Sequence, residues 1–203
     1  MQKNVVEIYE YLKSLKLLES SPKFWWPNAG TFEVVVGAIL TQNTTWKNVE
    51  KSLKNLEDFL ELTAFVKLDE DLLKEMIRPS GFYTQKAPRL LALAKNIQQE
   101  FQTFETFQKQ VRREWLLAQK GIGEESADAI LCYACFRDEM VVDSYTKRLL
   151  KKFGIAFKTY KEYKDFLESS LRLHYKEEDI FTVFADFHGM IVEYNKHYKK
   201  ELL

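Results

Sequence analysis

The chain has few cysteines, and this limits the metal sites that it can build. Only two of its 203 residues are cysteine, Cys132 and Cys135, within a stretch that predicts a helix. This count excludes a four-cysteine iron–sulfur cluster. A zinc site would need a second pair of suitably spaced ligands, which the sequence does not show. We interpret both cysteines as small buried residues, and we expect neither a metal nor a cofactor.

Membrane and export signals are also missing from the sequence. It has no signal peptide and no apolar run of membrane-spanning length, so we expect a protein without membrane contact in a reducing, cytoplasmic setting. An excess of charge is missing as well, because 30 basic residues balance 30 acidic ones. DNA-binding proteins often carry a basic excess, so any positively charged surface must be local.

Apolar residues are abundant and follow helical periodicity. They make up 46% of the chain, which supports a well-buried core and argues against disorder. No stretch of useful length alternates apolar and polar residues as a strand would. The expected fold class is therefore all-α. Apart from the stretch around residues 115–135, helices are predicted over residues 5–18, 32–40, 46–60, 72–77, 82–100, 143–153, 160–171 and 176–198.

The stretch from residue 115 to residue 135 predicts a helix, a tight turn and a second helix. Gly121-Ile122-Gly123 forms the turn, where glycine takes backbone angles that a side chain would forbid. Glu124 and Glu125 begin the second helix, where acidic residues suit the first turn. Free N–H groups at the turn, together with the helix dipole, can hold a phosphate. From the turn alone, an ordinary helical hairpin is the other interpretation.

Further motifs extend this pattern to a known family. Lys120-Gly121-Ile122-Gly123, Ser126-Ala127 and Val142-Asp143 together resemble the helix-hairpin-helix and aspartate signature of the endonuclease III superfamily of DNA glycosylases. Residues 37–44, Gly-Ala-Ile-Leu-Thr-Gln-Asn-Thr, resemble its first conserved helix and DNA-inserting loop. Trp25-Trp26-Pro27, before that helix, resembles the monofunctional 3-methyladenine glycosylase branch, which lacks the iron–sulfur cluster.

The resemblance implies two helical lobes with an active-site cleft between them. A six-helix barrel domain with the hairpin would span residues 28–140, and residues 1–27 plus 141–203 would form the second domain. The implied partner is double-stranded DNA containing a damaged base, and we expect the protein to be a monomer. The residues expected to contact DNA are Gln42, Asn43, Lys120, Gly121, Gly123 and Ser126. The alternative role of the polar loop at 41–45 is to cap the next helix.

Asp143 is the expected catalytic residue. Base excision breaks an N-glycosidic bond through an oxocarbenium-like transition state, and a carboxylate near the sugar can stabilise its charge and help to activate water. If Asp143 heads a helix, the helix dipole favours the ionised form. From its position alone Asp143 is more simply an N-cap, a role that aspartate often fills. The two roles are compatible.

The expected base pocket is aromatic. Alkylated purines such as 3-methyladenine are cationic, and aromatic faces attract cations. Trp25, Trp26, Pro27 and Trp46 are expected to line the pocket, although the same rings can instead fill the core beneath their loops. Lys196 matches a pocket-side lysine of the subgroup in position, and its alternative role is simple solvent exposure.

One position separates hydrolytic members of the superfamily from those that also cut the DNA backbone. The latter carry a lysine just after the hairpin, which forms a Schiff base with the sugar. Counting from Gly121, that position is Glu125, which cannot form an imine. We therefore predict a monofunctional glycosylase. We interpret His188 as a core or helix-face histidine.

Three other functions stay open at this point. The first is a superfamily glycosylase for mismatched or oxidised bases, which the aromatic density around residues 24–27 disfavours. The second is a non-catalytic helix-hairpin-helix DNA-binding protein, against which the Val142-Asp143 context speaks. The third is a helical interaction protein without nucleic acid, which zero net charge favours.

Overall fold

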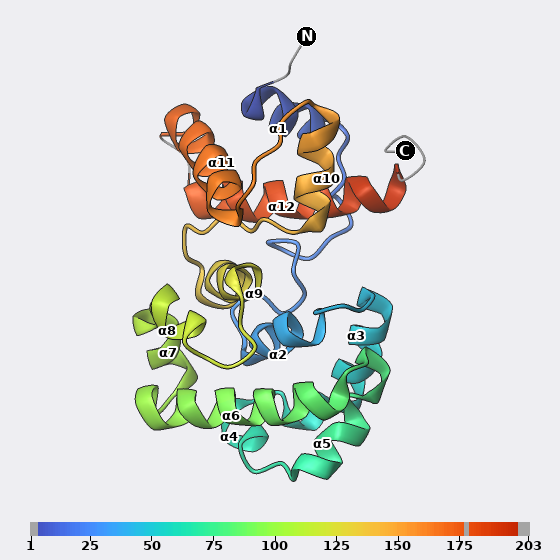
Figure 1. The fold of residues 1–203 in the computed structure, drawn as a ribbon, viewed down its shortest axis with the longest axis vertical. Coiled ribbons are helices and arrows are strands. Elements are labelled where there is room, and N and C mark those ends of the chain that lie inside the picture. Colours follow the sequence, from blue (N-terminus) through green and yellow to red (C-terminus); the bar gives the residue numbers. More distant parts are fainter. Residues whose placement is uncertain (1–3, 177–178, 199–203) are drawn as a thin grey trace. The chain divides into compact units, whose positions relative to one another are not determined.

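The computed structural model describes residues 4–176 and 179–198 (Figure 1). Within these ranges the chain forms helices joined by turns and contains no strand, so the all-α prediction is confirmed. None of the helices in these ranges is long and apolar enough to cross a membrane. The chain divides into two compact units, which we call unit 1 (Met1–Ala29 and Leu131–Leu203) and unit 2 (Gly30–Ile130).

Unit 2 is built around a long helix, α6 (Tyr83–Phe101). It packs against α5, α7, α4 and α2, and Figure 1 shows α5 and α7 beside it. Helix α2 is apolar except for Glu33 in its first turn, and its other eight residues are buried. The elements of this unit are α2 (Phe32–Leu40), α3 (Trp46–Asn55), η1 (Glu57–Phe59), α4 (Leu62–Phe65), α5 (Glu70–Met76), η2 (Arg78–Ser80), α6, α7 (Phe104–Gln110), α8 (Arg113–Leu117) and α9 (Glu124–Ala129).

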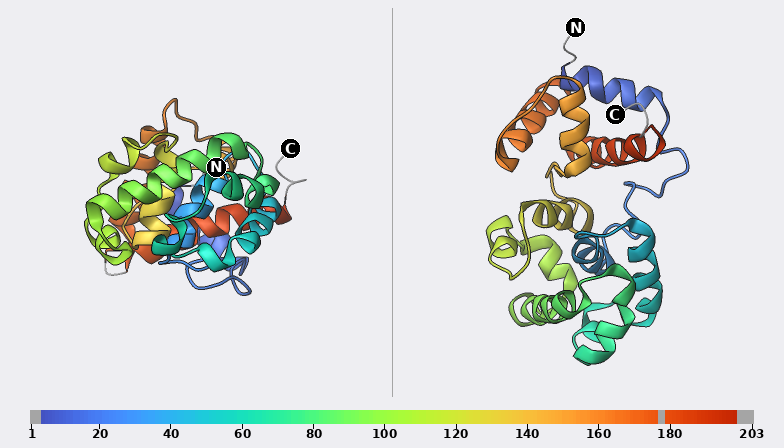
Figure 2. Two further views of the ribbon diagram at one scale, coloured as in Figure 1. Left: turned by 90° about the horizontal axis from the view of Figure 1, so that it is seen from below. Right: turned by 45° about the vertical axis from the view of Figure 1, so that its right-hand side comes forward.

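Unit 1 joins the two ends of the sequence in one core. In Figures 1 and 2 the N-terminal helix α1 (Val5–Ser14) lies beside the C-terminal helices, and it contacts both α11 and α12. Ile8, Leu12, Leu149, Leu167 and Phe187 are all fully buried in this core. The other elements are η3 (Ile130–Ala134), α10 (Ser144–Lys152), α11 (Tyr160–His174) and α12 (Ile180–His197).

Helix ends differ from the sequence-based expectation where local geometry ends the helix early. Helix α1 ends at Ser14 rather than residue 18, because Lys16 takes a left-handed φ of 56°. Helix α3 ends at Asn55 rather than residue 60, where the chain tightens into the 3₁₀ turn η1. Helix α12 begins at Ile180 rather than residue 176, and residues 177–178 lie outside the described ranges.

Residues 131–140 group with unit 1, whereas the domain boundary expected from the sequence lies after residue 140. Tyr133 explains this grouping, because its hydroxyl oxygen lies 3.1 Å from the carbonyl oxygen of Ala185 on α12, within hydrogen-bonding distance. Met140 is likewise fully buried in the unit 1 core. The hairpin is therefore divided, with its turn and α9 in unit 2 and the following π-helical turn η3 almost entirely in unit 1.

Candidate active site and nucleic-acid interface

Asp143 is the N-cap of α10, which confirms the expectation that it begins a helix. Its Oδ1 accepts hydrogen bonds from the Thr146 backbone N–H at 2.7 Å and from the Thr146 hydroxyl at 2.9 Å. Its side chain is 14% exposed. The carboxylate is thus held at the positive end of a helix dipole while keeping some access to solvent.

Asp143 is held in its ionised form. Burial by itself would raise the pKa of this carboxyl, but the interaction with His188 and the two donors of Thr146 outweigh burial and lower the pKa. An ionised carboxylate is the state that stabilises a developing positive charge. The site therefore has the charge that glycosidic bond cleavage requires, while the catalytic role of Asp143 stays a prediction.

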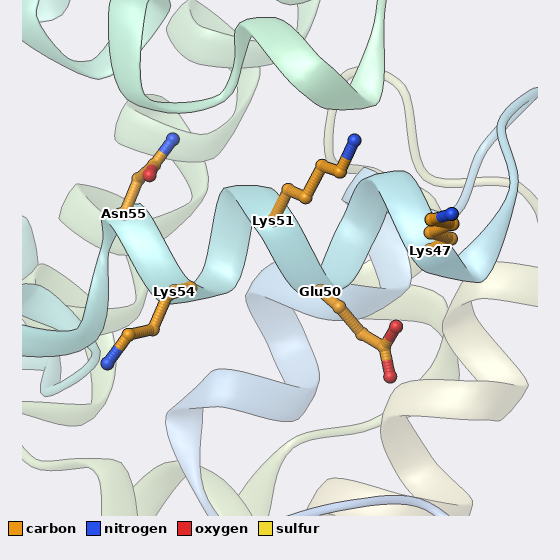
Figure 3. Close-up of a pocket in the computed structure, with 5 residues that line it drawn as sticks. All are labelled: Lys47, Glu50, Lys51, Lys54 and Asn55. Carbon is orange, nitrogen blue, oxygen red and sulfur yellow. The ribbon is translucent and has the colours of Figure 1, made fainter.

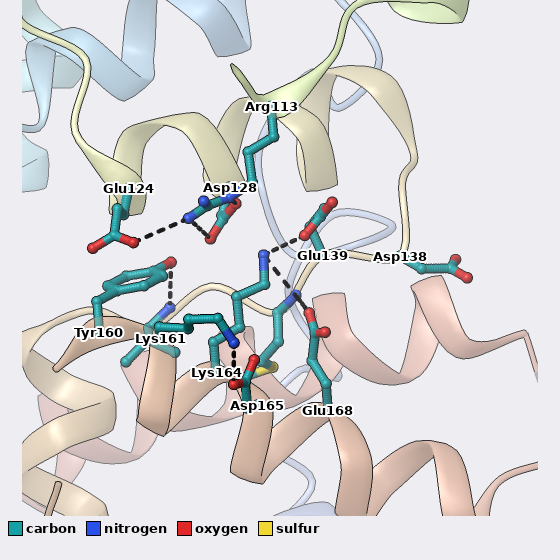
Figure 4. A network of polar contacts seen from close by, with 12 residues as sticks. Arg113, Glu124, Asp128, Asp138, Glu139, Tyr160, Lys161, Lys164, Asp165 and Glu168 are labelled. Atoms are coloured by element: carbon teal, nitrogen blue, oxygen red, sulfur yellow. Dashed lines mark hydrogen bonds and ion pairs between the residues drawn. The ribbon is translucent and has the colours of Figure 1, made fainter. Parts of the chain in front are cut away.

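The segment that leads to Asp143 is fixed by α11. The Met140 N–H donates to Glu168 Oε1 at 2.9 Å, and the Val142 N–H donates to the Tyr160 hydroxyl at 3.3 Å. Lys164, also on α11, pairs with Glu139 from the same segment (Figure 4). These contacts tie the backbone before Asp143 to a helix rather than leaving it as a free loop.

His188, which we interpreted as a core or helix-face histidine, lies next to Asp143. Its side chain is 5% exposed, and Nε2 is 3.5 Å from Asp143 Oδ2. Nδ1 is 2.7 Å from the Tyr133 hydroxyl oxygen. The sequence separation of 45 residues between His188 and Asp143 hides this pairing, and neither residue lies in a local motif with the other.

The aromatic segment before unit 2 has a strained backbone. Phe24 and Trp25 both take left-handed φ values, 63° and 64°, which side-chain-bearing residues rarely adopt. Such strain persists only where the surroundings fix it. Here the Phe24 ring packs against Phe136 and Phe181, at centroid distances of 5.5 and 4.9 Å. The segment is therefore held in one conformation by its rings.

Trp25 packs on α12, and its indole N–H reaches a polar cluster formed with Glu193 and Lys196. A Cβ at Gly189 would lie 2.5 Å from Trp25 Cγ, so the ring fits only because that position is glycine. The indole N–H donates to Glu193 Oε1 at 2.8 Å. Lys196 Nζ donates to the same oxygen at 2.7 Å and lies 5.8 Å from the Trp25 ring centroid. Unit 1 thus brings together Trp25 and Lys196 of the expected pocket.

The other expected pocket residues have different surroundings. Trp26 is 7% exposed and packs against Tyr133, with ring centroids 5.2 Å apart. Pro27 is half-buried. Trp46 belongs to unit 2, where its indole N–H donates to Glu50 Oε1 at 2.9 Å. The role of these three residues in a base pocket stays a prediction.

In the hairpin of unit 2, glutamine from the polar loop contacts the glycine turn. Gln42 Nε2 donates to the Gly121 carbonyl and to Ser126 Oγ, each at 3.0 Å. Gly121 has a φ of +88°, and Gly123 has open space where a Cβ would stand. Gln42, Gly121, Gly123 and Ser126 are therefore assembled at one place, whereas Asn43 and Lys120 are exposed, Asn43 with a φ of 53°.

A buried ion pair supports the hairpin from inside unit 2. Asp128 on α9 is fully buried, and its two oxygens accept from Arg113 Nε at 2.7 Å and Nη2 at 3.2 Å (Figure 4). Arg113 also pairs with Glu124 at 3.5 Å. Because a bidentate pair fixes both distance and orientation, α8 and α9 are held on either side of the turn.

The surface depression in Figure 3 is lined by residues of α3 alone, and it is the solvated face of that helix; the lining residues are Lys47, Glu50, Lys51, Lys54 and Asn55. Both cysteines are buried, as predicted, and burial raises the pKa of Cys135 to about 12. In residues 4–176 and 179–198 no cluster of three or more His, Cys, Asp or Glu side chains could hold a metal ion.

Comparison with known proteins places this site in a family. Residues 36–172 match the family described as HhH-GPD superfamily base excision DNA repair protein. A candidate DNA repair glycosylase of Methanocaldococcus jannaschii is 40% identical over 98% of this chain and 91% of its own length. The crystal structure of an H. pylori 3-methyladenine DNA glycosylase, MagIII, bound to 1,N6-ethenoadenine, is similar at a TM-score of 0.91 and 45% identity. This similarity covers 97% of this chain and 99% of that chain.

A more distant structure shares the fold. An endonuclease III–DNA complex superposes with a TM-score of 0.75 at 17% identity, covering 96% of this chain and 87% of that chain. The family match spans the glycine turn and Asp143 together, and the two closer similarities extend over almost the whole sequence. The chain therefore belongs to the HhH-GPD superfamily of base excision DNA repair proteins.

Proposed function

We propose that this glycosylase hydrolyses the N-glycosidic bond of alkylated purines, such as 3-methyladenine, in double-stranded DNA. The observation that carries the proposal is the ionised Asp143 at the start of α10. The similarity to the H. pylori 3-methyladenine glycosylase over nearly the full length of both chains supports the choice of substrate. In this proposal the protein acts as a cytoplasmic monomer without a bound cofactor.

In this reaction Asp143 acts on the sugar. As the glycosidic bond breaks, positive charge develops on the deoxyribose, and the carboxylate stabilises it electrostatically and orients the attacking water. The two hydrogen bonds from Thr146 fix Oδ1, so the carboxylate need not reorganise during the reaction. The alkylated base leaves as a neutral purine, because its positive charge is lost when it takes the electrons of the broken bond.

Recognition of the base would involve Trp25. A cationic alkylpurine is attracted to the face of an indole ring, and the Trp25 ring is fixed by its packing on Gly189. Lys196 would repel such a cation if it were alone. Its amine is paired with Glu193 at 2.7 Å, and Glu193 is only 15% exposed, so the pair presents little net charge to the ring.

We also propose that the protein does not cut the DNA backbone. Glu125 occupies the position that follows the hairpin and cannot form a Schiff base. The test uses duplex DNA with a single 3-methyladenine, incubated with the enzyme and then divided for alkali and borohydride treatment. We expect free 3-methyladenine, strand breaks only after alkali, and no borohydride-trapped protein–DNA adduct.

Two outcomes would separate the parts of this proposal. Strand breaks without alkali, or a trapped adduct, would contradict the monofunctional assignment while leaving the substrate intact. An absence of 3-methyladenine release, combined with tight binding to an abasic-site duplex, would contradict the substrate class while leaving the glycosylase family. Duplexes with a mismatched thymine or 8-oxoguanine, run in parallel, would then show which other base is released.

A further inference from the structure

The two oxygens of Asp143 have separate partners. Oδ1 accepts hydrogen bonds from the backbone N–H and the hydroxyl of Thr146, and these bonds form the N-cap of α10. Oδ2 faces His188 of α12, whose Nε2 lies 3.5 Å away. Within residues 4–176 and 179–198 this buried Nε2 has no hydrogen-bond partner. At 3.5 Å the contact is longer than a normal hydrogen bond, and catalytic contacts of this kind often tighten only when the substrate binds.

The other ring nitrogen determines where the proton of His188 lies. Nδ1 is 2.7 Å from the Tyr133 hydroxyl, which also lies 3.1 Å from the Ala185 carbonyl. If Tyr133 donates to Nδ1, the neutral ring carries its proton on Nε2. If Tyr133 donates to Ala185 instead, Nδ1 must carry a proton in order to bond the Tyr133 oxygen. In that case an unprotonated Nε2 would turn its lone pair toward the Asp143 carboxylate, and this repulsion is avoided only if Nε2 also carries a proton. Both arrangements that avoid repulsion place an N–H on Nε2, directed at Asp143.

Packing holds the His188 ring in this orientation. Trp25 contacts it edge-on, with centroids 5.2 Å apart and an interplanar angle of 86°. Tyr133 lies on another side at 5.8 Å, and its ring is fully buried. The ring that we propose for base recognition therefore also fixes the histidine beside the carboxylate, which places base binding and sugar chemistry on one packed cluster.

We infer that His188 is a positioning residue for Asp143, holding Oδ2 with its Nε2–H so that the carboxylate keeps one orientation toward the sugar. This inference rests on the proposed function, since it describes how Asp143 performs that chemistry. His188 does not touch the substrate in this account. It acts through Asp143, and Tyr133 acts through His188 by selecting which ring nitrogen carries the proton.

The titratable groups around His188 come from three elements. Asp143 faces it from the start of α10, and Tyr133 faces it from η3. Burial raises the pKa of the Tyr133 hydroxyl well above its usual value, and the nearby Cys132, Asp143 and, from α12, Asp186 raise it further. Tyr133 therefore stays protonated throughout the pH range of the assay. Any pH dependence that a His188 substitution changes can be assigned to the Asp143–His188 pair.

The test compares four variants with the wild-type protein. His188→Leu removes the donor, whereas His188→Gln can place an amide N–H near the position of Nε2. Tyr133→Phe keeps the aromatic ring at position 133 but removes the hydroxyl that selects which nitrogen of His188 carries the proton. His174→Gln is the matched control, because His174 is an exposed histidine at the end of α11. Circular dichroism and thermal unfolding first establish that each variant is folded.

Three quantities are then measured. The first is the pKa of Asp143, from the pH titration of its carboxyl ¹³C resonance in the free protein. The second is the single-turnover rate of 3-methyladenine release as a function of pH. The third is the Kd for an abasic-site duplex. We expect His188→Leu to raise the pKa of Asp143, to move the acid limb of the rate profile to higher pH, and to slow release about 10- to 100-fold. Its Kd should change less than about twofold, because His188 makes no DNA contact in this account.

The conservative variants decide between positioning and a merely structural role. His188→Gln should recover most of the rate and most of the pKa shift, Tyr133→Phe should give an intermediate loss, and His174→Gln should match wild type. An unchanged Asp143 pKa and rate in His188→Leu would overturn the inference, as would equal losses in the Leu and Gln variants without a pKa change. If wild type released no alkylpurine but the Asp143 pKa still rose in His188→Leu, the proposed substrate would fail while the Asp143–His188 interaction would stand.

Discussion

Replacing each glycine of the hairpin by alanine should have opposite effects. Gly121→Ala should mainly lower thermal stability, and Gly123→Ala should mainly weaken DNA binding. Gly121 has a φ of +88°, and a Cβ there would lie 2.6 Å from Arg89 Cδ and 3.0 Å from Nε. Gly123 takes an extended φ of −95° as the N-cap of α9, and nothing lies within 4 Å of a Cβ built there. One substitution thus meets backbone strain and a neighbour, whereas the other enters open space.

The magnitudes follow from these geometries. A Cβ in the left-handed region costs about 1–2 kcal/mol, and moving the flexible Arg89 side chain off its preferred rotamer adds about 0.5–1 kcal/mol. Gly121→Ala should therefore destabilise the protein by about 2 kcal/mol, which lowers Tm by about 4–8 °C for a chain of this length. For Gly123→Ala, a cost of about 0.5–1 kcal/mol at the N-cap, where glycine is preferred to alanine, is offset by about 0.4–1 kcal/mol of lost unfolded-state entropy.

DNA binding should be weakened by Gly123→Ala, the variant that is expected to lose little thermal stability. If the N–H groups at Gly123 and at the start of α9 hold a phosphate, a methyl group at Gly123 occupies the space that the phosphate needs. Losing one charge-assisted hydrogen bond costs about 1.5–3 kcal/mol, so Gly123→Ala should weaken binding to an abasic-site duplex about 10-fold or more. Thermal unfolding and fluorescence anisotropy at fixed salt measure the two effects. Wild-type affinity in Gly123→Ala would refute the phosphate assignment, and an unchanged Tm in Gly121→Ala would refute the strain argument.

Three further predictions concern buried contacts. Burial lowers the pKa of Lys86 from 10.5 to about 8. Between these two pH values the folded protein therefore binds fewer protons at Lys86 than the unfolded chain does. The free energy of unfolding should rise as the pH increases across that window. The rise is at most on the order of 3 kcal/mol, and it should be absent from urea titrations of Lys86→Met. Arg113→Ala leaves the fully buried Asp128 without its bidentate partner and should cost about 3 kcal/mol in the same titrations; a loss below 1 kcal/mol would contradict this. Gly189→Ala should displace Trp25, destabilise the fold by about 1–3 kcal/mol and shift the tryptophan emission, and an unchanged spectrum and Tm would show that the ring can move without cost.

Much of the fold is encoded in local sequence patterns. The strongly apolar run over residues 32–40 predicted α2 with both ends correct, because burial on most sides leaves little freedom to the helix. Asp143 was placed correctly as the residue that begins α10, since an N-cap is a local interaction between residues three apart. The ends of α1 and α3 were missed, because a left-handed Lys16 and a 3₁₀ turn after Leu56 are set by packing rather than by composition.

The contacts of the candidate site depend on residues far apart in the sequence. Trp25 and Glu193 are 168 positions apart, and Tyr133 and His188 are 55 apart, so no local pattern joins either pair. For Trp25, the sequence does contain one indication that it contacts α12. Gly189 interrupts an apolar helix, where glycine is unfavourable unless another group approaches closely, and Trp25 is that group. The family resemblance supplied Asp143, but it gave no reason to single out His188.

The central claim is that the charge of Asp143, rather than its capping role, drives base release, and Asp143→Asn tests it most directly. Asparagine caps helices as well as aspartate, so its oxygen can still accept from Thr146 and Tm should change by less than about 4 °C. Single-turnover release of 3-methyladenine from duplex DNA should nevertheless fall about 10²- to 10⁴-fold, with the Kd for an abasic-site duplex almost unchanged. Release within about threefold of wild type from a normally folded Asp143→Asn protein would contradict the account.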